Sequence, residues 1–173
     1  MKRMMTIAGI IAATTFLTAC NTTTNHPVKR TNAMQMTIHQ QLEHDRQQTE
    51  RNKANVLAFY EMAFNQHKVQ QAVNLYVGDK YLQHNPTVAD GGQAFVNAFA
   101  PFLAENAGSR AVVKRVAADG DLVWVHVHST LNADDAGEAV VDIFRLDNDG
   151  KIIEHWDVIQ AVPSETASGR SMF

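Results

Sequence analysis

The feature of the sequence that most constrains its fold is a change of hydrophobic period near residue 110. Before this point apolar residues recur every three or four positions, as in the helical face formed by Val56, Phe59, Tyr60, Ala63 and Phe64. After it, apolar and polar residues alternate in four runs, 110–117, 122–131, 138–146 and 151–162. Helices followed by consecutive strands predict an α+β domain, with the helices packed on one face of an antiparallel sheet of four or more strands.

Three helices are expected before the sheet, over 41–65, 68–77 and 93–106. Gly78-Asp79 ends the second, and Gly91-Gly92 precedes the third. Pro101 lies inside the third helix and predicts a bend or a break there. The total length of 173 residues suits one such domain.

Residues 1–19 are typical of a secretory signal, because two basic residues precede a short apolar stretch. The segment ends in Leu17-Thr18-Ala19-Cys20, which resembles a bacterial lipobox. This resemblance implies cleavage before Cys20, acylation of that cysteine and a stable anchor in a lipid bilayer. Asn21 follows the cysteine, which by resemblance to Gram-negative sorting signals favours the outer membrane of the bacterial envelope. The alternatives are an ordinary secreted protein and a buried N-terminal helix.

The rest of the chain divides into three parts by composition. Residues 20–40 are rich in Thr, Asn and Gln and predict a flexible tether. Residues 41–163 hold the periodic segments and form the predicted domain, and residues 164–173 predict a loose tail.

Charge and cysteine content exclude several function classes. The formal net charge is −3, so no basic face is expected and nucleic acid is not an expected partner. One cysteine allows neither an intrachain disulfide nor a cysteine-based zinc site. The motifs of dinucleotide, phosphate-loop, serine-hydrolase and His-Glu-x-x-His sites are missing from the sequence.

The run 122–131 carries two histidines on one face. Trp124, His126 and His128 share that face, and the opposite face consists of Val123, Val125 and Val127. We expect the histidines to face a polar pocket. The alternative interpretation places them on the solvated face and the valines in the core.

The run 138–146 places a carboxylate among apolar residues. Asp142 shares a face with Val140 and Phe144. A carboxylate in such surroundings is suited to acid–base chemistry. The alternative is an ion pair across the strands.

Two further segments are dense in polar and aromatic side chains. Tyr81-Leu82-Gln83-His84-Asn85-Pro86 predicts part of a site, or else a turn held by side-chain amides. Glu154-His155-Trp156-Asp157 places His155 with Asp157 on one face, and Trp156 on the other as a pocket wall or a core residue.

These motifs resemble the SnoaL-like family. Tyr81 to Pro86, followed by Gly91 and Phe95, resembles its early motif, and the stretch from Asp142 to Gln160 resembles its closing hairpin. The resemblance covers roughly residues 50–162. It implies the cone-shaped fold of the nuclear-transport-factor-two-like superfamily, in which three helices cover a curved sheet and a pocket opens on the concave side.

The resemblance also implies a site and a reaction. Family cyclases use a pocket Asp with a His for aldol closure, which gives Asp142 as base, with His84 and His126 or His128 as partners. Asp157 is a competing carboxylate. The remaining expected ligand contacts are Tyr81, Asn85, Trp124, His128, Phe144, Trp156 and Asp157.

Three functions remain open from the sequence. The first is cofactor-free proton transfer next to a carbonyl of a small organic molecule, by cyclisation, isomerisation or dehydration. The second is non-catalytic binding of a small molecule or lipid. The third is a metal site at His126 and His128 with His84 and Asp142, although the resemblance implies neither metal nor cofactor. A homodimer is expected through the sheet face that carries the three valines.

Overall fold

The computed structural model describes residues 26–173, with side chains described from Met34 on. The predicted signal segment and Cys20 lie outside the described residues. The larger of two compact units comprises Ile38–Phe173. Within the part of the chain that is described, no helix combines the length and the apolar character needed to cross a membrane.

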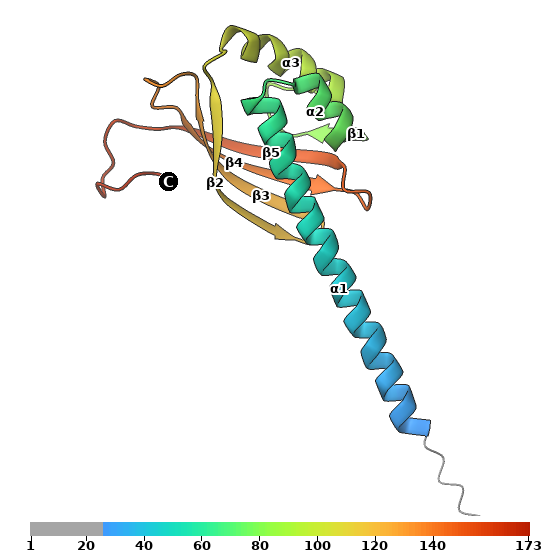
Figure 1. The fold of residues 1–173 in the computed structure, drawn as a ribbon. Helices are drawn as coiled ribbons and strands as arrows, with labels where there is room; N and C mark the ends of the chain where they lie inside the picture. The colour runs from blue at the N-terminus through green and yellow to red at the C-terminus, as the bar shows by residue number, and fades with distance from the viewer. Residues whose placement is uncertain (1–25) are drawn as a thin grey trace, which may run out of the picture. The chain divides into compact units, whose positions relative to one another are not determined.

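Helices and strands follow one another in the predicted order (Figure 1). The helices are α1 (His26–Tyr60), which continues into the π-helix Glu61–Asn65, α2 (Val69–Tyr76) and α3 (Gly92–Glu105). The strands are β1 (Val77–Gln83), β2 (Arg110–Asp119), β3 (Leu122–Thr130), β4 (Glu138–Leu146) and β5 (Ile152–Ala161). Helix α1 begins at His26, inside the segment that we expected to be a tether.

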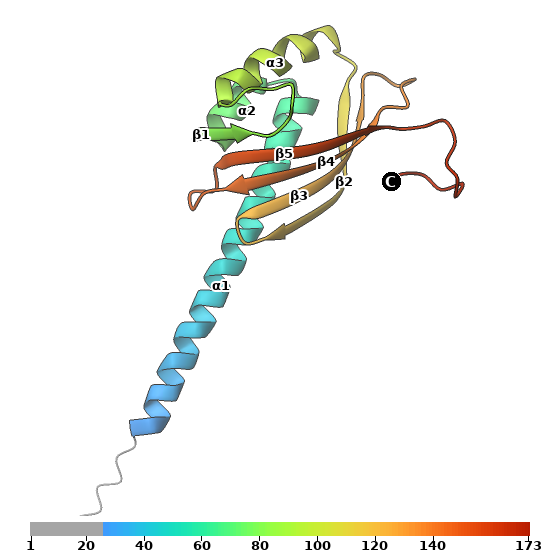
Figure 2. The same cartoon turned by 180° about the vertical axis from the view of Figure 1, so that it is seen from behind.

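The strands form one sheet in the order β1-β5-β4-β3-β2. β2 to β5 pair antiparallel in sequence order, as predicted, whereas β1 pairs parallel with β5 at the edge. The sheet curves beneath α2 and α3, and the end of α1 lies against it (Figure 2). The α+β class and the cone shape are confirmed, and β1 adds a fifth strand outside the four runs that we predicted to be strands.

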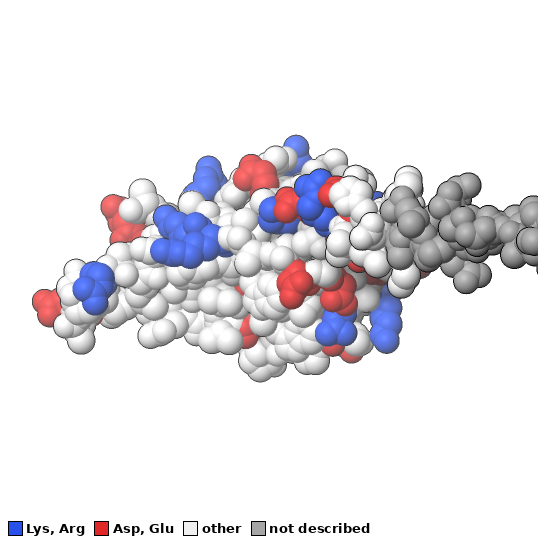
Figure 3. All heavy atoms as spheres, turned by 90° about the horizontal axis from the view of Figure 1, so that it is seen from below, with Lys and Arg blue, Asp and Glu red and all other residues white. Residues whose placement is uncertain are grey.

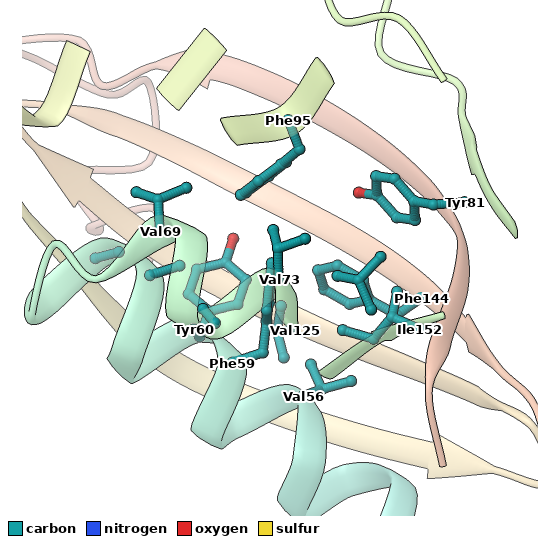
Figure 4. Close-up of a cluster of buried hydrophobic side chains, with 14 of the residues drawn as sticks. Val56, Phe59, Tyr60, Val69, Val73, Tyr81, Phe95, Val125, Phe144 and Ile152 are labelled. Atoms are coloured by element: carbon teal, nitrogen blue, oxygen red, sulfur yellow. The ribbon is translucent and has the colours of Figure 1, made fainter. Parts of the chain in front are cut away.

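The core lies between the helices and the inner face of the sheet (Figure 4). Val56 and Phe59 of α1 are almost completely buried, as are Phe144 and Ile152 of the sheet. Phe59 contacts Phe144 edge-on, with ring centroids 6.1 Å apart. The spacing that predicted α1 therefore also predicted which of its faces packs.

Helix α3 runs through Pro101 without a break. A proline removes the hydrogen bond to the carbonyl four residues earlier, here that of Asn97. Both Pro101 and Asn97 lie at exposed positions, where water can satisfy that carbonyl. The predicted helix 93–106 is thus confirmed, and of the bend or break predicted at Pro101 the break does not occur.

The two faces of β3 are the reverse of our expectation. Val123, Val125 and Val127 are at most 1% exposed and point into the core, so His126 and His128 lie on the outer face. Burying three valines removes more apolar surface from water than burying two histidines, and it leaves no imidazole to be desolvated. The valines therefore cannot form the dimer face that we predicted.

Charged side chains of both signs are distributed over the surface. On the face shown in Figure 3, basic and acidic residues are interspersed, and neither forms a continuous patch. This distribution fits the small net charge of the chain.

Candidate functional site

A cavity of about 500 Å³ lies between the helices and the inner face of the sheet. Aromatic rings of α1 and α3 form much of its wall, and Phe95 and Phe99 lie with ring centroids 4.5 Å apart. One group of its polar side chains, which we call the polar cluster, comes from α1, from the end of β1 and the residues after it, and from β4 and β5. It consists of Tyr60, Tyr81, Gln83, Asn85, Asp142, His155 and Asp157.

Asp142 is held at both carboxylate oxygens. It lies on the inner face of β4 and is only 4% exposed. Its Oδ1 lies 2.9 Å from Nε2 of His155, and its Oδ2 accepts a hydrogen bond from the Tyr60 hydroxyl. These two partners stabilise a carboxylate at a position where water is largely excluded.

The hydrogen-bond network assigns the proton on the other nitrogen of His155. The backbone N–H of Asn85 donates to Gln83 Oε1 at 3.1 Å, which fixes the orientation of that amide. The same oxygen lies 2.7 Å from His155 Nδ1, and because an amide oxygen only accepts, Nδ1 carries a hydrogen. The bond between His155 and Asp142 therefore contains a proton that either residue can carry.

Asp157 lies directly opposite Asp142 in the pairing of β4 with β5. Its Oδ2 accepts a hydrogen bond of 2.6 Å from the side chain of Asn85. Its Oδ1 has no hydrogen bond from any residue that the structure describes. Asp157 is thus a cavity carboxylate with one oxygen available to a ligand.

Tyr81 supplies a free hydroxyl proton. Its oxygen accepts a hydrogen bond of 3.2 Å from Gln83 Nε2, while its own hydrogen has no acceptor among the described residues. Burial raises the pKa of Tyr81, and the nearby charges of Asp142 and Asp157 raise it further. The phenol therefore stays protonated and can donate to a ligand; the hydroxyls of Tyr60 and Tyr81 both point into the interior (Figure 4).

Tyr60 is also kept protonated. Burial raises its pKa well above the ordinary value, and the charge of Asp142 and its hydrogen bond to that residue add to the effect. Because the Tyr60 hydrogen is committed to Asp142, Tyr81 is the one of these two tyrosines whose hydroxyl can donate to a ligand.

The structure brings together only some of the predicted site residues. Five of them line the cavity: Tyr81, Asn85, Asp142, Phe144 and Asp157. Five others lie outside it: His84, Trp124, His126, His128 and Trp156. The predicted convergence of His84, His126 and Trp156 on Asp142 is therefore wrong.

Strand parity explains why Trp156 and His84 lie elsewhere. His155 and Asp157 point inward, so Trp156 between them points to the outer face. The ring of His84 stacks on Trp156 at 4.8 Å, and its Nε2 lies 3.0 Å from a carboxylate oxygen of Glu154.

The outer-face histidines have their own partners. His126 Nδ1 lies 3.1 Å from an Arg115 nitrogen, and His128 Nε2 lies 2.9 Å from the Ala136 carbonyl oxygen. The ring of His126 stacks on that of Phe173, and the ring of His128 lies tilted against it. Phe173 belongs to a segment without helix or strand. The metal site that we considered at His126 and His128 with His84 and Asp142 does not form.

Three residues of the polar cluster were not among the predicted site residues: Tyr60, Gln83 and His155. The sequence held a signal for His155, which shares its strand face with Asp157. Gln83 lies inside the segment 81–86 that we did select. Tyr60 was read only as part of an apolar helix face, and nothing in its spacing distinguishes it from a core residue.

One group in the described part of the chain has the geometry to hold a cation. Asp142, His155 and Asp157 each offer a ligand atom, and these atoms lie within 4.8 Å of one another. Such nitrogen and oxygen ligands suit zinc, iron or manganese. Two of these three residues, His155 and Asp142, are joined instead by a hydrogen bond.

Comparisons with solved structures identify the fold. An NTF2-like protein from Mesorhizobium loti shares 20% identity over 66% of this chain and 94% of its own, with a TM-score of 0.55. A candidate polyketide cyclase from Acidithiobacillus ferrooxidans shares 15% over 64% and 88%, also at 0.55. An LEH-like epoxide hydrolase from M. tuberculosis shares 23% over 65% and 84%, at 0.51. These likenesses show the cone of the NTF2-like proteins.

A sequence comparison with curated proteins gives no match. The family model described as "SnoaL-like domain" matches residues 56–155, which is more than half of the chain. The matched range includes the polar cluster from Tyr60 to His155 and ends two residues before Asp157. The chain therefore belongs to the SnoaL-like domain family.

Proposed function

We propose that the domain binds a small organic molecule with a carbonyl group and moves a proton at the carbon next to it. The observation that carries this proposal is the difference between the two carboxylates that face each other on β4 and β5. Both oxygens of Asp142 are hydrogen-bonded, whereas Asp157 keeps one oxygen open beside the cavity.

In this proposal Asp157 is the base. Its open oxygen takes a proton from the carbon beside the carbonyl, and the C–H electron pair forms a carbon–carbon double bond as the carbonyl oxygen becomes an enolate. The Tyr81 hydroxyl donates a hydrogen bond to that oxygen, where negative charge develops. Asp142 was our sequence candidate for the base, but its two hydrogen bonds favour Asp157 for this role.

The enolate can then follow three routes. The proton can return at another carbon, the enolate carbon can attack a second carbonyl, or a leaving group can depart. These are isomerisation, aldol cyclisation and dehydration. The proton shared by His155 and Asp142 lies in the same wall of the cavity and is available to a product oxygen.

Non-catalytic binding is the second candidate. The aromatic wall formed by Phe59, Phe64, Phe95 and Phe99 would retain an apolar molecule without any acid–base step. In that case Asp142, Tyr60 and His155 would serve to hold the sheet to α1.

Hydrogen exchange separates the two candidates. The purified domain is mixed with a simple ketone in D₂O, and loss of the protons beside the carbonyl is followed by NMR. The proposal expects exchange above the buffer rate, reduced by Tyr81→Phe and unaffected by His84→Ala on the outer face. Ketone binding with exchange at the buffer rate would favour the non-catalytic candidate, and lack of ketone binding would overturn the catalytic one.

The cellular setting is also a proposal. We propose that acylated Cys20 anchors the protein in the bacterial envelope, in the outer membrane. The support is the signal-like segment 1–19 and the Leu17-Thr18-Ala19-Cys20 motif.

A further inference from the structure

The cavity reaches the surface at a rim of exposed apolar side chains. Phe102 of α3, Leu131 after β3 and Ile159 of β5 line the cavity, yet they are 43%, 42% and 47% exposed. Large apolar residues that are both exposed and part of a cavity wall mark a place where a ligand covers them. We call these three residues the apolar rim.

The apolar rim lies some distance from the polar cluster. On β5 the rim residue Ile159 lies two positions after Asp157, about 7 Å along the strand, and Ala161, which also lines the cavity, lies four positions after it, about 13 Å along the strand. On α3 Phe102 lies seven positions after Phe95, whose ring contacts that of Tyr81, which is about 10 Å along the helix. Two independent elements thus give the cavity an elongated shape with the polar cluster at one end.

The wall between the two ends is apolar. Phe64 and Phe99 lie edge to face with ring centroids 5.5 Å apart on the helical side. Val127 and Val140 face them from paired positions on β3 and β4. A ligand that spans this distance therefore needs an apolar chain rather than a hydroxylated one.

The charges near the rim disfavour an anionic chain end. Arg110 lies there with Glu138 and Asp135, so negative charge is in excess. Asp135 accepts hydrogen bonds from the backbone N–H groups of Leu131 and Gly137, at 2.7 and 3.0 Å, which keep its carboxylate ionised. A carboxylate on the ligand would meet repulsion at this end, whereas a neutral alkyl chain would not.

We infer that the ligand is a neutral, unbranched alkyl ketone whose carbonyl lies at Asp157 and Tyr81 and whose chain runs along the aromatic wall to the apolar rim. The inference rests on the proposed function, because it takes the polar cluster as the place of the carbonyl. It adds the substrate class and names the rim residues as those that select chain length.

The test compares two ketones that differ only in chain length, butanone and nonan-2-one, in ligand-observed NMR titrations of the purified domain. Nonan-2-one is expected to bind on the order of 10²-fold more tightly, because its additional methylenes are removed from water. Ile159→Ser and Leu131→Ser are expected to weaken nonan-2-one binding about five-fold or more and to leave butanone unchanged. Both side chains are about half exposed, so the fold tolerates the change.

Two variants make the result specific. Val158→Ser alters the neighbouring residue, which is 71% exposed and points to the outer face, and it should change neither affinity. Tyr81→Phe should weaken both ketones alike, because it acts on the carbonyl end. Equal affinity for the two ketones, or equal effects of Ile159→Ser and Val158→Ser, would overturn the inference while leaving the proposed function in place. Lack of binding by both ketones would overturn the proposed function itself.

Discussion

Asp142 and Asp157 are direct partners in the β4–β5 pairing, and both line the same cavity, but they differ in how their oxygens are used. Asp142 accepts from Tyr60 and interacts with His155, whereas Asp157 has a single partner, Asn85. The different hydrogen-bond partners of these two neighbouring carboxylates suit them to different roles. One is built into the wall, and the other is presented to the cavity.

This difference predicts that Asp157→Asn mainly lowers the rate of ketone hydrogen exchange, whereas Asp142→Asn mainly lowers the stability of the fold. Asp157→Asn should lower ketone hydrogen exchange by roughly 10²-fold or more, since a general base is lost, with little change in stability. Asp142→Asn should lower the free energy of unfolding by about 1–3 kcal/mol, because an amide cannot accept from both Tyr60 and His155. Urea denaturation and the exchange assay together check both, and a catalytic loss confined to Asp142→Asn would return the role of base to Asp142.

The buried tyrosines predict the stability of the domain at high pH. In the unfolded chain the phenols of Tyr60 and Tyr81 lose their protons near pH 10, while burial raises both pKa values in the folded protein. Above pH 10 the unfolded state therefore binds fewer protons, so stability falls as pH rises, by about 1.4 kcal/mol per pH unit for each phenol. Urea titrations at several pH values should show a shallower fall for Tyr60→Phe, and an unchanged slope would contradict the assignment.

Gly137 predicts a strong sequence constraint at the end of the cavity. Its φ is +76°, and a Cβ built there would collide with the Ser129 backbone oxygen. Gly120 has a similar φ of +59° with open space around it. Gly137→Ala should therefore cost roughly 2–4 kcal/mol of stability and Gly120→Ala roughly 1 kcal/mol. Thermal denaturation checks that Gly137→Ala loses more stability than Gly120→Ala. Equal losses would mean that backbone conformation alone decides the effect.

The lipobox resemblance predicts where the protein is found. Cys20→Ser should move it from the membrane fraction to the soluble periplasm, because the acylated residue is replaced. Immunoblots of fractionated cells check this, with the wild-type chain beside the variant. A Cys20→Ser chain that still fractionates with the membrane would exclude the anchor.

A homodimer remains a prediction, now without the valine face that first suggested it. The outer face of the sheet still exposes Val141 and Val158, paired across β4 and β5, at 42% and 71%. Light scattering at micromolar concentration should give twice the mass of the chain, and Val158→Arg should reduce it to the monomer. A wild-type mass equal to one chain would end the prediction.

The sequence was sufficient for the fold because the information is periodic and local. The change from period 3.6 to period two fixed the class, and turn clusters fixed the limits of four strands. The parallel pairing of β1 with β5 was out of reach, since its partners, such as Gln83 and His155, are far apart in the chain. Pattern alone does not give such a register.

For the site, the sequence predicted which residues share a strand face, but not which of the two faces points into the cavity. Alternation groups His155 with Asp157, and Trp124 with His126, yet it does not say which group faces inward. On β3 the valines and the histidines competed for the core, and the cost of desolvating two imidazoles decided the outcome. Tyr60 was hidden because a phenol whose ring packs in the core and whose hydroxyl reaches a carboxylate looks like any other core aromatic in a sequence.

The polar network also ties the end of the first helix to the last strand. The hydrogen bonds from Tyr60 to Asp142 and between His155 and Gln83 join residues 82 and 72 positions apart. Because contacts of such long range slow folding, the network is completed only when the last strand has paired. A nascent or truncated chain without β5 keeps Asp142 and Tyr81 but lacks His155 and the proposed base Asp157. Any ligand held by this network binds only the completely folded chain and shifts the folding equilibrium toward it. Resistance to proteolysis in the presence of a ketone would thus report whether the last strand is in place.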